Sequence, residues 1–472
     1  MNKESLKKIY ITVFTIFLGL LIAFYFLAGD QLKYRDSRKN FLLTEANGTT
    51  KEVVRGVKVE QFFFNKIERL KSVSVLCTTQ YRENSGTMTV RVLDGTDELF
   101  SQEIDVADIK ENEPVTIESA DYLEGYAGKE LEIEITANSV SGKGVSILMN
   151  GDTVIGSRLY VGNKMNGAIC FGVAGQESIF TGQNYWQIVG VLSALLCVVL
   201  FLSYRKYSKC GTGYIPRAIG AVQRYSFLIS QLVSRDFKTK YKRSILGVFW
   251  SFLNPLLTMT VQYVVFSTLF RNDIKNYSVY LLSGIVCFSF FNEVTNMCLQ
   301  SISSNANLIK KVYIPKYIFP LSRTISSSVN LIISLIPLIL ITLLSGLNIH
   351  PSFILMFFFL VCLIIFALGV GMVLSSLMVF FRDIQFLWSV LVMVWQYGTP
   401  IFYSPNIIPE RFQFILKFNP IYHFINNIRM CIIDGISPEP RAYMYCFVFA
   451  LASLLIGSLV FKKTQDKFTL YL

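Results

Sequence analysis

The chain has 472 residues, of which 52% are hydrophobic and only 16% are charged. Soluble domains carry about a quarter charged residues, so this composition excludes an ordinary soluble protein and indicates a membrane protein. Residues 30–185 hold 23 acidic and 17 basic side chains, whereas the rest of the chain holds 9 acidic and 27 basic ones. A basic excess confined to the hydrophobic part is typical of cytoplasmic loops between spans, and it argues against nucleic-acid binding.

The first apolar run, residues 9–28, is long enough to cross a hydrocarbon core of roughly 30 Å at about 1.5 Å per residue. Lys3, Lys7 and Lys8 precede it and hold the N-terminus in the cytoplasm. Because the run is too long for a typical signal peptide, we expect a transmembrane anchor that is retained rather than cleaved.

Residues 30–180 have the pattern of an all-β domain. Apolar and polar residues alternate in 88–92 and 131–135, and Asp94-Gly95 and Asn150-Gly151 separate such runs as hairpin turns do. Further strands are expected at 73–77, 98–106, 145–149 and 168–173. This spacing predicts a jelly-roll-like antiparallel β-sandwich. For Cys77 and Cys170, which lie within it, we expect buried reduced thiols, with a disulfide as the alternative.

A second span over residues 186–204 returns the chain to the cytoplasm, because Arg205, Lys206 and Lys209 follow it. The β-domain is therefore expected to be extracellular. Residues 220–243 then read as an amphipathic helix, with apolar side chains at spacings of three and four. Its basic side chains Arg235, Lys238, Lys240 and Lys242 suit the headgroup layer of anionic lipid, and a solvated surface helix is the alternative.

The remaining chain, residues 247–465, is expected to form a core of six spans. They are predicted at 247–270, 278–302, 318–346, 353–381, 384–403 and 442–461, with short re-entrant helices over 404–441. Both termini are then cytoplasmic. The predicted fold class is a polytopic α-helical membrane protein of about eight spans with an inserted extracellular all-β sandwich.

The sequence contains no motif for catalysis or nucleotide binding. GxxxxGK[ST] is absent, so this chain cannot cradle a nucleotide phosphate in a P-loop by itself. No CxxC pair occurs, and His350 and His423 are the only histidines. We therefore expect no catalytic residue, no metal site and no cofactor bound by this chain.

Four ordered stretches within residues 220–465 resemble the ABC-2 type permeases, most closely the branch that exports polysaccharides such as O-antigen and teichoic acid. The stretches are Leu232–Lys238 with Leu246–Trp250 and Asn254-Pro255, then Leu308–Pro315, Phe381–Ile384, and Thr399–Ser404 with Asn419–Ile421. The resemblance covers only the C-terminal half, and the outer β-domain departs from the family plan.

The resemblance implies a permease without enzymatic activity of its own. Two copies would assemble with an ABC ATPase subunit, which holds ATP and Mg²⁺, and would move a lipid-linked glycan. It also implies that the stretch around residue 310 couples the permease to the ATPase. The residues concerned are Leu308, Ile309, Lys310, Lys311, Tyr313 and Pro315, and a simple basic cytoplasmic loop is the alternative.

Aromatic residues crowd the predicted spans and offer rings on which sugars stack. We predict that Trp250, Trp388, Trp395, Tyr397, Phe402 and Tyr403 line a glycan channel, and lipid-facing interface belts are the alternative. In the outer domain, Tyr81, Tyr122, Tyr126 and Tyr160 are candidates for contact with glycan, or else ordinary core and edge residues.

Glu293 lies inside a predicted span, where a carboxylate is costly and normally paired. Arg323 is expected at a similar depth on the neighbouring span. The sequence therefore predicts a structural Glu293–Arg323 ion pair.

Three other functions remain open. One is an ABC-2 exporter of a lipid or drug. Another is an integral-membrane glycosyltransferase, although few acids lie outside the sandwich to activate a hydroxyl. The third, a membrane receptor for cell-wall glycan, would not need eight spans.

Overall fold

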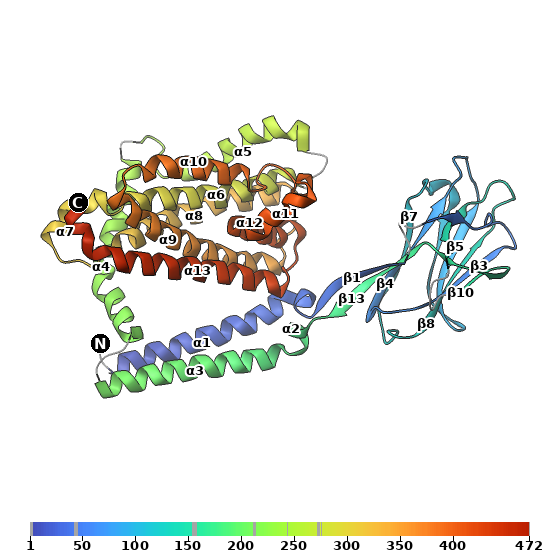
Figure 1. The fold of residues 1–472 in the computed structure, drawn as a ribbon, viewed down its shortest axis with the longest axis horizontal. Coiled ribbons are helices and arrows are strands. Elements are labelled where there is room, and N and C mark those ends of the chain that lie inside the picture. The colour runs from blue at the N-terminus through green and yellow to red at the C-terminus, as the bar shows by residue number, and fades with distance from the viewer. Residues whose placement is uncertain are drawn as a thin grey trace. The chain divides into compact units, whose positions relative to one another are not determined.

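The computed structural model describes residues 3–41, 46–152, 158–210, 214–242, 244–270, 274 and 276–471. The chain forms two compact units, which Figure 1 shows as a helical part and a β part. The β unit comprises Lys33–Tyr185, and the helical unit comprises Met1–Leu32 and Trp186–Leu472. Among these described residues, six helices are long and apolar enough to cross a membrane. The predicted class, a polytopic helical membrane protein with an inserted β-domain, is confirmed.

The β unit is built from two antiparallel sheets. Within the described residues, one sheet has the order β11-β10-β3-β8-β5-β6, and the other has the order β1-β13-β4-β9-β12, with β7 beside β4 and β2 beside β9. Buried residues from both sheets, such as Ile133 and Val73, belong to one hydrophobic cluster. The sheets therefore pack face to face as a sandwich. The strands are β1 Tyr34–Phe41, β2 Gly48–Thr49, β3 Lys58–Phe64, β4 Arg69–Thr78, β5 Thr87–Asp94, β6 Asp97–Asp105, β7 Pro114–Glu124, β8 Glu130–Ala137, β9 Ser146–Asn150, β10 Arg158–Val161, β11 Asn163–Met165, β12 Ala168–Ile169 and β13 Phe171–Ser178.

One of the two predicted hairpins is present. Gly95 joins β5 to β6 with a φ of 66°, which glycine adopts without strain. The Asn150-Gly151 hairpin is wrong, because β9 and β10 lie in different sheets and the chain crosses between them. Residues 153–157 of that crossing lie outside the described residues. Cys77 and Cys170 are both buried and free, as the simpler interpretation expected.

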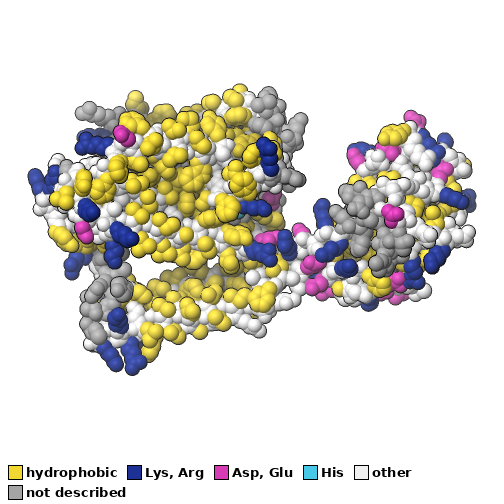
Figure 2. Space-filling view, in the orientation of Figure 1, with side chains coloured by type: hydrophobic (Ala, Val, Ile, Leu, Met, Phe, Trp, Pro, Cys, Tyr) yellow, Lys and Arg dark blue, Asp and Glu magenta, His cyan; other side chains and the backbone are white. Residues whose placement is uncertain are grey.

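In the helical unit, the N-terminus, α7 and the C-terminus lie at one end, while α11 and α12 lie at the other (Figure 1). Figure 2 shows hydrophobic side chains over most of the visible face of this unit, with Lys and Arg mainly toward its ends. The helices are α1 Lys3–Ala28, α3 Tyr185–Cys210, α4 Tyr214–Tyr241, α5 Phe249–Phe270, α6 Tyr277–Leu299, α7 Ala306–Lys311, α8 Ile318–Leu344, α9 Met356–Phe380, α10 Ile384–Tyr397, α11 Gln413–Phe418, α12 Pro420–Arg429, α13 Pro440–Thr464 and α14 Phe468–Tyr471, with a π-helical turn, η7, at Met430–Asp434.

Six of the eight predicted spans have both the length and the apolar character of a span, and they are α1, α3, α6, α8, α9 and α13. The helix α5 has 22 residues but carries the polar Asn254 and Gln262 and a proline, Pro255. The helix α10 has only 14 residues, or roughly 21 Å at about 1.5 Å per residue. The predicted full span over 384–403 is therefore wrong. Pro400 restricts the residue before it to extended backbone, and the helix ends at Tyr397.

The helices α9 and α13 approach each other closely through small residues. A Cβ atom added at Gly369 would lie 2.4 Å from the backbone of Ser453, and one at Gly457 would lie 2.3 Å from the Gly369 carbonyl oxygen. Small residues at such crossings let two membrane helices pack backbone against backbone.

Substitution at this crossing should destabilise the helical unit. We expect Gly369→Ala to lower the free energy of unfolding by roughly 1–3 kcal/mol, because the added methyl group must push α13 away. A thermal melt in detergent, followed by fluorescence, measures this loss of stability. Gly190→Ala in α3 is the matched control, since nothing lies within 4 Å of a Cβ there. Equal melting temperatures for the two variants would contradict the close packing.

Candidate functional site

The helix α4 packs on the protein through an apolar stripe. Leu232 is buried in a cluster with Ile309 of α7, Ile318 and Phe319 of α8, and Phe461 of α13. Tyr225, Leu228 and Ile229 of α4 pack against the same cluster, at the spacings of three and four that align side chains on one helix face. The stripe fixes α4 against the end of the helical unit that carries α7.

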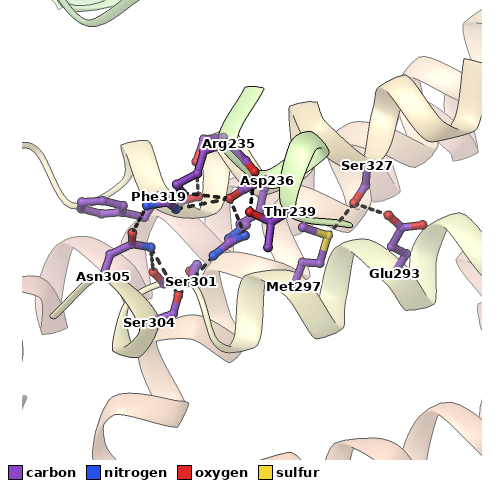
Figure 3. Close-up of polar contacts among 12 residues, drawn as sticks. Arg235, Asp236, Thr239, Glu293, Met297, Ser301, Ser304, Asn305, Phe319 and Ser327 are labelled. Carbon is purple, nitrogen blue, oxygen red and sulfur yellow. Dashed lines mark hydrogen bonds and ion pairs between the residues drawn. The ribbon is translucent and has the colours of Figure 1, made fainter. Parts of the chain in front are cut away.

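Beside this stripe lies a polar group that we call the Asp236 cluster, comprising Arg235, Asp236, Ser304, Asn305 and Arg323. Figure 3 labels the first four of these residues. Asp236 is only 6% exposed, and its Oδ1 lies 2.8 Å from Arg323 Nη1 and 3.2 Å from Arg235 Nη2. Arg235 also donates to Asn305 Oδ1 at 3.1 Å, and Arg323 donates to Ser304 Oγ at 3.2 Å. Because Asn305 directly precedes α7, the cluster ties α4 and α8 to the start of α7.

One turn further along α4, a second group forms the Glu293 cluster, comprising Lys240, Tyr241, Glu293, Ser327 and Asn330. Glu293 Oε1 accepts from Lys240 Nζ at 2.9 Å, from Asn330 Nδ2 at 2.7 Å and from Ser327 Oγ at 3.3 Å. Asn330 Oδ1 in turn accepts from the Tyr241 hydroxyl at 2.9 Å. One oxygen of the Glu293 carboxylate therefore accepts three hydrogen bonds, and the cluster joins α4, α6 and α8.

A cavity of about 320 Å³ opens beside the Glu293 cluster between α4, α5, α6 and α8. Its wall is rich in hydroxyl and amide side chains and includes one exposed indole, that of Trp250. The polar members beyond the cluster are Ser251, Asn254, Thr258, Ser289 and Ser334. A second hollow of about 480 Å³ is lined by the members of the Asp236 cluster other than Asn305, and Lys240 and Glu293 line both hollows. Such walls can hold polar groups through hydrogen bonds.

The predicted Glu293–Arg323 pair is wrong, because each residue pairs with α4 instead. Glu293 binds Lys240, and Arg323 binds Asp236. Asp236 and Lys240 stand four residues apart, so they lie on one face of α4 and present opposite charges to α6 and α8. Sequence reasoning missed Asp236, although it is the only acidic residue of α4.

The same geometry gives two of the interfacial basic residues a further contact. Arg235, Lys238, Lys240 and Lys242 are all exposed, as a lipid-facing role requires. Arg235 and Lys240 also reach carboxylates of the two clusters and so help to hold α4 in place. The contact of these four residues with lipid stays a prediction.

The predicted coupling stretch has a part that packs against the protein, Leu308 and Ile309, and an exposed tip, which is Lys310, Lys311 and Tyr313. Ile309 is 8% exposed, and Leu308 packs against the same apolar cluster. Lys310 and Lys311 are exposed, and Tyr313 is 94% exposed. The chain leaves α7 in an extended conformation, and Pro315 precedes the start of α8. Only the tip is available to a partner.

Most of the predicted channel aromatics pack within one copy of the chain. Trp388 and Phe402 are buried, and Trp395 lies 5.2 Å from the Phe291 ring and donates to Asn419 at 2.9 Å. Tyr403 is half-buried and donates to the Tyr397 carbonyl at 2.9 Å. Interior packing encloses most of the Trp388 and Phe402 rings, although Trp388 also lines a hollow of about 540 Å³, and their channel role stays a prediction. Trp250 and Tyr397 are exposed and keep that role as a prediction.

Arg429 is a buried residue that sequence reasoning missed. Its guanidinium donates to the carbonyl oxygens of Tyr280, Pro400 and Ile401 at 2.8–3.2 Å and lies 3.4 Å from the centre of the Tyr280 ring. The carbonyls of Pro400 and Ile401 belong to the turn that ends α10, where helical bonds stop. A planar five-donor group satisfies them together.

Lysine cannot reproduce this fork. We expect Arg429→Lys to lower the free energy of unfolding by roughly 3 kcal/mol, since at least two charge-assisted hydrogen bonds are lost. Arg441→Lys is the matched control, because Arg441 is exposed at the start of α13. A thermal melt of both variants in detergent measures the difference, and an unchanged Arg429→Lys melt would show that the fork is dispensable.

In the β unit, three of the four candidate tyrosines already cover other side chains. Tyr122 lies 4.8 Å from the Arg69 guanidinium, Tyr126 lies 4.7 Å from Lys129 Nζ, and Tyr160 lies 6.0 Å from the Phe62 ring. Tyr81 is 88% exposed. Their contact with glycan stays a prediction.

Comparison with known proteins identifies the helical core. The model of the family "ABC-2 type transporter" matches residues 228–433, a range that contains both polar clusters, α7 and Arg429. The O-antigen export system permease protein RfbA of Klebsiella pneumoniae is 30% identical over 245 residues, which cover 51% of this chain and 93% of that protein. RfbA of Myxococcus xanthus is 27% identical over 256 residues, covering 53% and 98%. Polysialic acid transport protein KpsM of Escherichia coli is 21% identical over 241 residues, covering 50% and 93%. The chain belongs to the ABC-2 type transporter permease family.

Proposed function

We propose that this chain is the permease subunit of an exporter that moves a lipid-linked polysaccharide across the bacterial cytoplasmic membrane. The substrate class covers O-antigen, teichoic acid and related cell-surface glycans. The proposal rests on one observation: this chain matches nearly the whole length of two O-antigen export permeases. The alternative ABC-2 cargo is a lipid or a drug.

The polar cavity beside Glu293 supports a glycan cargo. Sugars and phosphates present many hydrogen-bonding groups, and the serine, threonine and asparagine side chains of the cavity wall can replace the water that such groups lose. The indole of Trp250 offers an apolar face for the C–H side of a sugar ring. A wall for a purely apolar drug would not need this many hydroxyls.

The exposed tip at Lys310, Lys311 and Tyr313 supports a separate ATPase subunit as the partner. We propose that this partner binds ATP and Mg²⁺. A movement of the partner at the tip would be transmitted to α4 and α8 through the Asp236 cluster, which includes Asn305 at the start of α7. The permease itself is not an enzyme.

We further propose that two copies of the chain assemble in the exporter. The helices α5 and α10 expose apolar side chains, among them Val261, Val264, Phe386, Val390 and Val394. A second copy or lipid would cover them. In this arrangement both termini are cytoplasmic, and the β-domain is extracellular, where emerging glycan can reach it.

The proposal is tested by reconstitution. The chain is purified with candidate ATPase subunits, inserted into inverted vesicles and supplied with the organism's glycolipid and ATP. Glycolipid should stimulate ATP hydrolysis, and glycan should become protected inside the vesicles. A partner whose Walker lysine is replaced by alanine is the control.

Two outcomes would reject the proposal. Stimulation by small lipids or drugs, with no glycan protected, would favour the other ABC-2 cargo. Glycan elongation by the chain without any ATPase would favour a glycosyltransferase.

A further inference from the structure

Three glutamates gather on the outer face of the six-stranded sheet of the β unit. Glu60 on β3 and Glu132 and Glu134 on β8 alternate with core residues, and their carboxylates offer oxygens that all lie within 4.8 Å of one another. Glu60 stands directly opposite Glu134 in the strand register. Like charges in that position destabilise a sheet unless a cation lies between them.

Basic side chains neutralise only part of this group. Lys58 Nζ lies 2.5 Å from Glu60 and 2.6 Å from Glu134, and Arg91 lies 3.4 Å from Glu134. Among the described residues, the basic group nearest to Glu132 is Lys58 Nζ, which lies 4.0 Å from its Oε1, beyond hydrogen-bonding distance.

Glu132 is the group that lacks compensation. It is 9% exposed, and its Oε1 has no hydrogen-bond partner within the described part of the chain. A buried carboxylate oxygen without a donor costs free energy, so either a proton or a further cation must be supplied.

We propose that Glu60, Glu132 and Glu134 bind a calcium ion. Calcium takes oxygen ligands at roughly 2.3–2.6 Å, so the oxygens around one ion lie no more than about 5 Å apart, and the carboxylate oxygens here all lie within 4.8 Å of one another. A set of three protein carboxylates suits calcium, whereas magnesium is usually held by only one or two. Lys58 is half exposed, so its side chain can turn into solvent when the ion enters. Lys58 therefore competes with the metal for the same carboxylates.

Equilibrium binding of radioactive calcium to the full chain in detergent tests the site. We expect one saturable site with a dissociation constant of about 0.1–1 mM, as in extracellular calcium modules. Glu132→Gln keeps the shape of the protonated carboxyl and should weaken binding by about tenfold or more, because a charged ligand is lost. Lys58→Met should tighten binding severalfold, because the competing ammonium is removed.

Glu118→Gln on β7 is the matched control, since Glu118 is exposed and lies in the other sheet. Its calcium affinity should equal that of the unmodified chain. Absence of saturable binding at 5 mM calcium would overturn the proposal. Unchanged calcium affinity in Glu132→Gln would also overturn it and would indicate that Glu132 is a protonated carboxyl. Unchanged affinity in Lys58→Met would overturn it as well and would indicate an ordinary ion-pair network.

Discussion

Replacing Asp236 with Asn is expected to abolish export and to lower the free energy of unfolding by roughly 3–5 kcal/mol, because Arg323 then loses the carboxylate with which it pairs. Arg323 is largely enclosed and pairs with Asp236 at 2.8 Å. Without the carboxylate, α4 loses its ion pair to α8, and Arg235 loses the partner beside its hydrogen bond to Asn305. Thermal stability and ATP-driven glycan protection in vesicles are the two measurements.

A charge-matched control separates this effect from general loss of charge. Asp383→Asn changes an exposed aspartate and should alter neither quantity measurably. The paired variant Asp236→Leu with Arg323→Met removes both charges and should recover stability, since an apolar pair replaces a buried ion pair at little cost. If the paired variant also recovers full export, the cluster serves stability alone. Unchanged stability in Asp236→Asn would contradict the burial of the pair.

Replacing Tyr313 with Ala is expected to reduce export at least about tenfold while leaving the melting temperature unchanged. A side chain that is 94% exposed contributes little to folding, whereas an interface tyrosine can contribute about 2 kcal/mol or more to binding. Co-purification of the ATPase subunit should fall in parallel. Leu308→Ala and Ile309→Ala should instead lower the melting temperature, because both side chains pack against the apolar cluster at this end of the helical unit.

An exposed tyrosine elsewhere provides the control for Tyr313. Tyr81 in the β unit is 88% exposed, and Tyr81→Ala should leave ATPase binding unchanged. Normal export and normal ATPase binding by Tyr313→Ala would show that the tip of α7 does not dock.

Hydropathy predicted most helices of the core because a lipid environment demands long apolar runs. It placed α6, α8 and α9 within a few residues of their observed ends. It failed at α10, where apolar residues continue past Tyr397 although the helix does not. In the β unit, β5 and β8 follow strict alternation and were predicted. The edge strand β1 was not, because its mostly charged and polar residues show no apolar period.

The polar clusters illustrate what a single sequence withholds. Glu293 was recognised as a costly carboxylate, but its partner was sought on the neighbouring span. The true partner, Lys240, comes from α4, which the basic residues had assigned to the lipid surface. Partner choice depends on how helices far apart in the chain pack, and charge counts carry no such information. The single acid of α4, Asp236, was the available signal.

The first and last strands of the β unit pair antiparallel, with Tyr34 opposite Ser178, and the Ile179 amide donates to the Lys33 carbonyl at 2.9 Å. The chain thus enters and leaves this unit at neighbouring points, about 5 Å apart as in any such ladder. A short reverse turn could span this distance in place of the whole β unit. The β unit is therefore an insertion that evolution could add, exchange or remove without moving the ends of α1 and α3. A fluorescent protein or an affinity tag with adjacent termini could be inserted at the same point of the chain.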